Sequence, residues 1–179
     1  MFFPPEMVME EFAELQQPKG LHGVVLVVCT GNVCRSPLAA TLLLHRLHQE
    51  GYTGIRVKSA GTHVTSPAPL TPYTRRVLAE RGFYVGPHRA RQATREQLHT
   101  VDLILVMEGA HAKALRHLVP ETAGRIHLIS ELGGAQYDIR APYQGSLWAH
   151  RLLAEELASL IETGWPRVLA WVAHGARSR

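Results

Sequence analysis

Cysteine is scarce in this sequence, which has only two among 179 residues, Cys29 and Cys34. Two thiols in one short stretch do not make a disulfide scaffold, so their spacing favours a chemical role. Apolar runs are short as well, and none approaches the roughly 18 residues that a membrane span needs. The first 14 residues contain four Glu and no Lys or Arg, which is unlike a signal peptide. We therefore expect a cytoplasmic protein without membrane association.

Basic runs and metal-ligand clusters are also missing. The formal net charge is +4, but the Arg residues are scattered and none of them lies in a basic-aromatic stretch, which argues against a nucleic-acid partner. Eleven His residues are present, yet spacings such as His45/His48 and His111/His117 supply no third ligand at a usable distance. The sequence thus predicts no metal site, and it makes no prediction about the oligomeric state.

The region around Cys29 organises the chain. Residues 24–28 form a β-branched apolar run, a tight polar loop follows, and a helical pattern then begins with Ser36 as the expected N-cap and Pro37 as the first helical residue. A helix N-terminus leaves backbone N–H groups unpaired and favours an anion such as phosphate or a thiolate. The planar guanidinium of Arg35 can bind two phosphoryl oxygens, and these surroundings favour Cys29 as a thiolate nucleophile.

Strand-type runs alternate with helical patterns along the rest of the chain. The expected strands are residues 24–28, 55–57, 102–106 and 126–129, and the expected helices are residues 37–50, 72–81, 109–118 and 146–163, with a brief helix after Thr94 and a shorter one from Trp165. Residues 59–69 are an expected loop, and Tyr73, Val77 and Leu78 are expected to face the core. The strands are apolar throughout, which predicts a three-layer α/β/α fold with a doubly wound parallel sheet of about four strands. Ligands bind such sheets at the carboxyl ends of the strands, where the Cys29 loop lies.

The loop and four further motifs resemble one known family. Cys29-x5-Arg35-Ser36 directly after the first strand, with Gly31 and Asn32 inside it, resembles the low-molecular-weight protein tyrosine phosphatases. The further motifs are Ser59-Ala60-Gly61-Thr62, His88-x-x-Arg91-Gln92, Asp102-Leu103-Ile104-Leu105-x-Met107 and Pro142-Tyr143. The resemblance implies a domain at residues 21–163.

Two segments lie outside the resemblance. Residues 1–20 are an expected N-terminal extension, in which Val8, Phe12 and Leu15 fall on one face of a short acidic helix. Residues 164–179 are an expected C-terminal extension.

The resemblance also implies a mechanism. Cys29 would attack phosphorus in line and become a phosphocysteine, while Arg35 and the loop amides hold the phosphoryl oxygens and Ser36 donates a hydrogen bond to the thiolate. The implied phosphate- and substrate-binding residues are Thr30, Gly31, Asn32, Val33, Cys34 and Tyr143. Asn32 and, more easily, Gly31 would accept an unusual backbone conformation, and Tyr143 would stack on an aromatic substrate. The reaction needs no metal or organic cofactor, and the partner would be a phosphorylated protein or peptide.

Cys34 has two interpretations. It fills space beside the loop, or, as in the family, it forms a disulfide with Cys29 under oxidation and so protects the nucleophile from irreversible overoxidation.

The sequence departs from the family pattern where the general acid is expected. The late loop of the family reads Asp-Pro-Tyr or Asp-Pro-Phe, whereas here Ala141 precedes Pro142-Tyr143. General acid–base catalysis contributes about 10²–10⁴-fold, so we expect slow turnover. Asp138 is the nearby carboxylate in that loop, and it is either a substitute acid or a partner in a loop hydrogen bond.

Several functions fit these residues. The first is a phosphoprotein phosphatase, with phosphotyrosine as the default substrate. The second is a phosphate-binding protein that traps phosphoproteins and releases them slowly. A protein-arginine phosphatase is less favoured, because Val33 has the shape of the Thr found in those relatives without its hydroxyl. An arsenate reductase is also less favoured, because no cysteine follows Cys34 to relay a disulfide.

Overall fold

The computed structural model describes residues 20–84, 86–142 and 145–178. The short acidic helix expected within residues 1–19 and the substrate-stacking residue Tyr143 lie outside the described residues.

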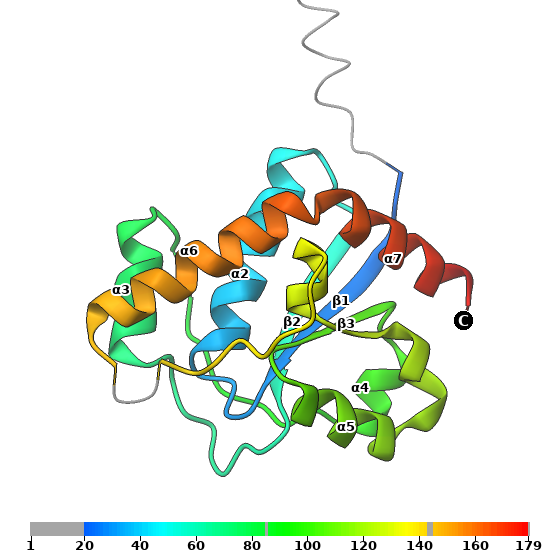
Figure 1. Cartoon of the computed structure of the whole chain (residues 1–179), viewed down its shortest axis with the longest axis horizontal. Coiled ribbons are helices and arrows are strands. Elements are labelled where there is room, and N and C mark those ends of the chain that lie inside the picture. The colour runs from blue at the N-terminus through cyan, green and yellow to red at the C-terminus, as the bar shows by residue number, and fades with distance from the viewer. Residues whose placement is uncertain (1–19, 85, 143–144, 179) are drawn as a thin grey trace, which may run out of the picture.

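The described chain alternates strands and helices (Figure 1). The strands are β1 (Gly23–Cys29), β2 (Ile55–Gly61), β3 (Leu103–Val106) and β4 (Ile126–Leu128). The α-helices are α2 (Arg35–Gln49), α3 (Pro72–Glu80), α4 (Arg95–His99), α5 (Gly109–Leu118), α6 (Leu147–Thr163) and α7 (Trp165–Arg177), and the 3-10 helices are η1 (Pro120–Arg125) and η2 (Ile129–Gly133).

The strands form one parallel sheet in the order β2-β1-β3-β4. This confirms the predicted doubly wound α/β fold. The chain moves from β1 to one side to form β2 and then to the other side to form β3, so the order reverses at β1. The carboxyl end of β1, at Cys29, is therefore the switch point where such sheets bind ligands.

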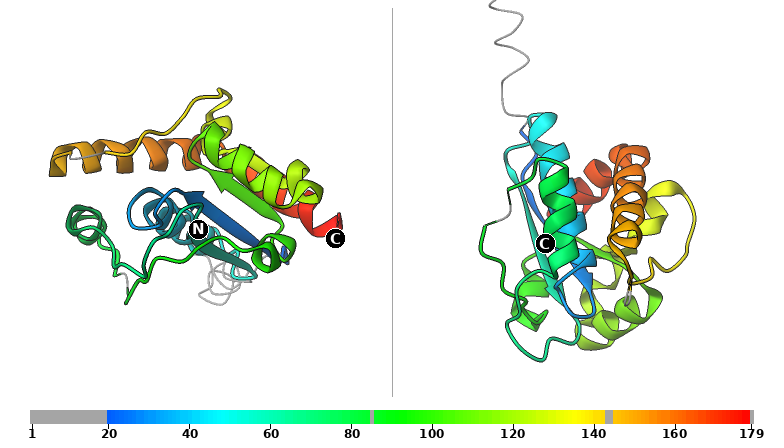
Figure 2. Two further views of the ribbon diagram at one scale, coloured as in Figure 1. Left: turned by 90° about the horizontal axis from the view of Figure 1, so that it is seen from below. Right: turned by 90° about the vertical axis from the view of Figure 1, so that its left-hand side faces the viewer.

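Both faces of the sheet are covered, which makes three layers (Figures 1 and 2). Alternate side chains of β1 point to opposite faces, so Val25 and Val27 pack with α2, α6 and α7, while Leu26 and Val28 pack with α4 and α5. All four side chains are fully buried. This burial on both sides explains why the strands read as continuous apolar runs.

Helix α7 packs onto this same core. It contacts β1 and β3, and its Val168 and Val172 are fully buried. The expected C-terminal extension thus contributes side chains to the core of the sheet domain, although the division at residues 163 and 164 stays a prediction.

Three local expectations were wrong. Residues 59–61 are not a loop but the end of β2, because Gly61 pairs with Cys29 in the parallel register. Helix α2 begins at Arg35, one residue before the expected N-cap, because the Ser36 side chain is buried and bonded elsewhere. Tyr73 does not face the core but is 46% exposed, and the buried position on that turn of α3 belongs to Thr74.

Gly61 sits where β2 passes the loop after β1. A Cβ on this residue would overlap the carbonyl oxygen of Thr30 and the side chain of Val64. Glycine is therefore the residue that lets β2 lie against the Cys29 loop.

Helix α6 is held to its neighbours by ion pairs. Arg46 of α2 pairs with Glu162, and Arg81, just after α3, pairs with Glu155. Glu80 of α3 accepts hydrogen bonds from Arg151 and Arg76, which lower its pKa to about 2.

Among the described residues, every helix is too short or too polar to traverse a bilayer.

Candidate active site

The loop between β1 and α2 is fixed in shape by Asn32. Its φ of 54° places it in the left-handed region, which Asn tolerates better than most residues. Its amide nitrogen donates to Ser36 Oγ at 3.0 Å and Ser59 Oγ at 2.9 Å, and its Oδ1 accepts from the Arg91 amide at 3.0 Å. Its carbonyl accepts from His88 Nε2 at 2.6 Å. The loop is thus held in place before any ligand arrives.

The conformational expectation for this loop was half right. Asn32 takes the unusual conformation, as expected. Gly31 does not, because the described glycines with positive φ are Gly51, Gly82 and Gly134.

Cys29 is buried at the end of β1, beside Ser36. Its sulfur lies 3.1 Å from Ser36 Oγ, and that hydroxyl also lies within hydrogen-bond distance of the Ala60 carbonyl, at 3.2 Å. The Asn32 amide already donates to Ser36 Oγ, so the single hydroxyl proton has two acceptors to choose between. When Cys29 is a thiolate, Ser36 can therefore turn its proton toward the sulfur.

Arg35 is 5% exposed and fixed by three partners. Its Nη1 donates to the Ile139 carbonyl at 2.9 Å and to the Glu108 carboxylate, with which it forms an ion pair. Its Nη2 donates to Thr30 Oγ1 at 3.3 Å. The guanidinium is therefore held at the edge of the loop with N–H groups left for a ligand.

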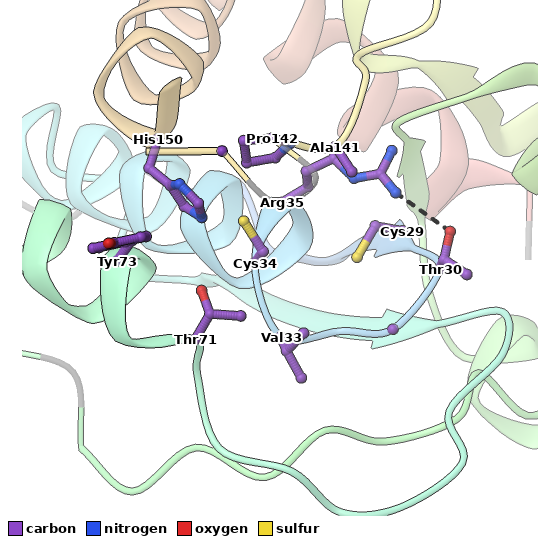
Figure 3. Close-up of a pocket in the computed structure, with 12 residues that line it drawn as sticks. Cys29, Thr30, Val33, Cys34, Arg35, Thr71, Tyr73, Ala141, Pro142 and His150 are labelled. Atoms are coloured by element: carbon purple, nitrogen blue, oxygen red, sulfur yellow. Dashed lines mark hydrogen bonds between the residues drawn. The ribbon is translucent and has the colours of Figure 1, made fainter. Parts of the chain in front are cut away.

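These residues open onto a pocket of about 720 Å³ (Figure 3). Its lining residues in the described chain are Cys29, Thr30, Gly31, Val33, Cys34, Arg35, Thr71, Tyr73, Ala141, Pro142, Gly145 and His150. Of the sequence-predicted site residues, Asn32 and Ser36 lie behind this lining as supports. None of the described lining residues is an Asp or a Glu.

Asp138 is not among the described lining residues of the pocket. Its Oδ1 accepts a hydrogen bond at 2.8 Å from the backbone N–H of Gly109, the first residue of α5. The next residue, Ile139, is buried, and its N–H donates to the Met107 carbonyl. Ala141 lines the pocket, at the chain position where the family resemblance implies an acid.

Sequence reasoning missed the wall that α3 and α6 add to the pocket. Tyr73 and His150 pack edge to face, with ring centroids 5.3 Å apart, and both line the pocket (Figure 3). His150 Nδ1 donates to the Ser146 carbonyl at 3.1 Å, and this hydrogen bond holds the ring against the start of α6. No motif in the sequence links these two helices.

Sequence reasoning also missed two residues that support the loop from the β3 side. They are Glu108, which pairs with Arg35, and His111, whose Nε2 lies 2.9 Å from Thr30 Oγ1. The available signal was their position directly after the buried strand β3, at the same sheet edge as Cys29.

Both cysteines are free thiols in the structure. Burial is the main cause that raises the pKa of Cys34, with hydrogen bonding to Thr74 opposing it. Cys34 is therefore favoured as the neutral thiol, and its protective disulfide stays a prediction.

Within the described part of the chain, no three His, Cys, Asp or Glu side chains are grouped so that they could hold a metal ion.

A Cys-x5-Arg loop at the switch point of a parallel α/β sheet is the arrangement of a phosphatase class. The low molecular weight phosphotyrosine protein phosphatase family has a model that matches residues 24–175. The chain belongs to this family.

Its relatives carry two kinds of name. A probable low molecular weight protein-tyrosine-phosphatase EpsP from Ralstonia nicotianae is 37% identical over 148 residues, or 83% of this chain and 92% of that protein. A protein-arginine-phosphatase from Geobacillus stearothermophilus is 31% identical, over 77% of this chain and 90% of that protein. The crystal structure of a low molecular weight protein tyrosine phosphatase from T. tengcongensis matches this chain with a TM-score of 0.76 and 34% identity, over 81% of this chain and 99% of that one.

Proposed function

We propose that this protein is a phosphoprotein phosphatase that works through a phosphocysteine and turns over slowly. The observation that supports the proposal is the meeting of Cys29 and Arg35 in the pocket lining, with Ser36 hydrogen-bonded to Cys29 behind it, while Ala141 lines the same pocket. In this proposal Cys29 is the nucleophile and Arg35 with its loop binds the phosphoryl oxygens, while the described lining offers no carboxylate to move protons. Phosphotyrosine is the default substrate, because the tyrosine phosphatase relatives are named for it.

The two half-reactions both need a proton transfer. In the first, the bond from Cys29 Sγ to phosphorus forms as the bond to the leaving-group oxygen breaks, and that oxygen leaves with the electron pair. In the second, the oxygen of a water molecule attacks phosphorus, the S–P bond breaks, and the water loses a proton. One carboxyl group can serve as acid in the first step and base in the second.

The methyl group of Ala141 can do neither. Losing general acid–base catalysis costs about 10²–10⁴-fold in rate, or roughly 3–5 kcal/mol of barrier. Since the stabilisation by Arg35 and the loop remains, turnover should be reduced rather than lost. Substrates with a good leaving group should suffer least, because their leaving oxygen needs little protonation.

A trapping protein is the second candidate function, and the same Ala141 favours it. A phosphate-binding loop without a general acid can bind a phosphoprotein and hold it, or the reaction can stop at the phosphocysteine. Asp138 stays a candidate acid only if the late loop rearranges, because its carboxylate now accepts from Gly109.

Phosphoarginine is a further substrate to test, because one relative is named a protein-arginine-phosphatase. Val33 lines the pocket without a hydroxyl to contact a guanidinium, so we expect phosphotyrosine peptides to be preferred over matched phosphoarginine peptides.

The deciding experiment measures hydrolysis of p-nitrophenyl phosphate and of matched phosphotyrosine and phosphoarginine peptides by the wild type and by Cys29→Ser. We expect slow wild-type turnover that the substitution abolishes. Wild-type turnover no faster than that of Cys29→Ser, with phosphopeptide binding retained, would favour the trap. A faster reaction with the phosphoarginine peptide would reverse the substrate assignment.

A further inference from the structure

The orientation of the His111 ring is fixed by a backbone group. His111 lies in the first turn of α5 and is 3% exposed. The N–H of Glu108 donates to its Nδ1 at 3.1 Å. A backbone N–H can only donate, so Nδ1 carries no proton and the proton of the neutral ring is on Nε2. Burial is the main cause that lowers the pKa of His111. The charges of Glu108 and Asp138 oppose this shift and the charge of Arg35 adds to it, so the neutral ring is favoured.

This tautomer decides how Thr30 is bonded. His111 Nε2 lies 2.9 Å from Thr30 Oγ1, so its N–H donates to that oxygen. Arg35 Nη2 donates to the same oxygen at 3.3 Å, because a guanidinium can only donate. A hydroxyl oxygen has two lone pairs, and both are now used.

The hydroxyl proton of Thr30 is left over. No residue in the described part of the chain accepts it, and Thr30 lines the pocket beside Cys29 and Arg35 (Figure 3). The two donors hold the oxygen so that its O–H must point away from both of them. A donor fixed in this way, at the edge of an anion site, is suited to a phosphoryl oxygen.

We propose that the Thr30 hydroxyl donates a hydrogen bond to an oxygen of the bound phosphoryl group, and that His111 is the positioning residue that makes it a donor. The proposal rests on the proposed function only in taking a phosphoryl group as the ligand of this pocket. It adds a side-chain contact to the backbone amides and guanidinium that the loop motif implied.

The same bonding excludes Thr30 as a replacement acid. If its hydroxyl gave up a proton and took one from Nε2, the neutral His111 ring would become an anion. Thr30 therefore contributes a hydrogen bond and transfers no proton. Its effect should appear in phosphate binding as well as in rate.

The test is calorimetric binding of inorganic phosphate to the full chain and its Thr30→Val and Thr30→Ser variants. Valine keeps the shape of threonine and removes the hydroxyl, whereas serine keeps the hydroxyl. A hydrogen bond to a charged acceptor is worth about 10- to 100-fold in affinity. We expect Thr30→Val to bind phosphate more weakly by that factor and Thr30→Ser to bind close to the wild type. Equal affinity of wild type and Thr30→Val, or equal loss in both variants, would overturn the proposal.

The positioning role of His111 is tested by a double-mutant cycle with His111→Phe. We expect this substitution to weaken phosphate binding when Thr30 is present and to have little further effect in the Thr30→Val background. The matched control is His117→Phe, an exposed histidine on the same helix. An equal effect of His111→Phe in both backgrounds would reduce His111 to a structural residue.

These binding measurements need no turnover. A protein that binds phosphate in a Thr30-dependent way but does not hydrolyse p-nitrophenyl phosphate would overturn the proposed activity and leave the Thr30 contact standing. Hydrolysis by the wild type, together with an unchanged phosphate affinity in Thr30→Val, would support the proposed activity and overturn the Thr30 contact.

Discussion

Two loops border the pocket, and they differ in what they are built to do. In the loop after β1, Asn32 makes hydrogen bonds through its side chain and its backbone carbonyl, and Arg35 has three partners. The late loop, described here over residues 134–142, is anchored through Tyr137, Asp138 and Ile139. Beyond these anchors it presents the exposed Ala141 to the pocket.

The difference separates binding from proton transfer. In the proposed reaction, the first loop supplies the nucleophile Cys29 and the groups that bind the phosphoryl oxygens. The second loop is also anchored to the fold, yet at the pocket it offers the methyl group of Ala141. Slow turnover would therefore come from one missing functional group and not from a poorly formed site.

The largest expected effect comes from restoring an acid with Ala141→Asp. Ala141 is exposed, so the new carboxyl needs no repacking. We expect a rate gain of about 10²–10⁴-fold on phosphates with poor leaving groups, and a smaller gain with p-nitrophenyl phosphate. The measurement is kcat across a series of aryl phosphates. Ala141→Asn is the control of matched size, and an equal gain in that variant would show that proton transfer is not the cause.

The next effect comes from breaking the first loop with Asn32→Ala. This removes buried hydrogen bonds worth about 1–3 kcal/mol when a partner is left unpaired. Alanine also keeps the backbone cost of a positive φ without the side-chain hydrogen bonds that offset it in asparagine. We expect a lower free energy of unfolding in urea and weaker phosphate binding. Asn32→Gly relieves the backbone cost of about 1 kcal/mol but not the lost bonds. Recovery of wild-type phosphate binding in the glycine variant would show that the side-chain bonds are dispensable.

A smaller effect is expected at Asp138 in the second loop. Asp138→Ala removes the acceptor at the start of α5 and should lower the free energy of unfolding by about 1 kcal/mol, with turnover near that of the wild type. Asp138→Asn keeps an acceptor oxygen and should restore the stability. A collapse of turnover in Asp138→Asn would instead make Asp138 the acid of the reaction.

The smallest effect is a pH dependence of stability from His111. Its pKa is lowered in the folded protein, so the unfolded chain binds more protons and stability is lost as the pH falls below about 6.5, the ordinary histidine value. The slope from one group is at most about 1.4 kcal/mol per pH unit. Urea unfolding at pH 7.5 and 5.5 should show a smaller loss for His111→Gln than for the wild type. Identical losses would mean that His111 does not titrate with unfolding.

The sequence predicted the features that depend on local pattern. The apolar runs located the strands, and the run ending at Val28 placed Cys29 at the carboxyl edge of the sheet. It could not predict the partners that tertiary contacts supply. Ser36 is not the N-cap of α2, because Asn32 and Ala60 engage its hydroxyl from other parts of the chain. Tyr73 lies at the pocket because His150 of α6 packs against it.

Gly61 has a consequence for sequence variation. Because any side chain there would overlap the Thr30 carbonyl, substitutions at this strand position should be rejected in a saturation scan for phosphate binding. Gly124, with nothing near its Cβ position, should accept many residues. The tolerance expected of these two glycines thus depends on the atoms that a Cβ would meet at each position.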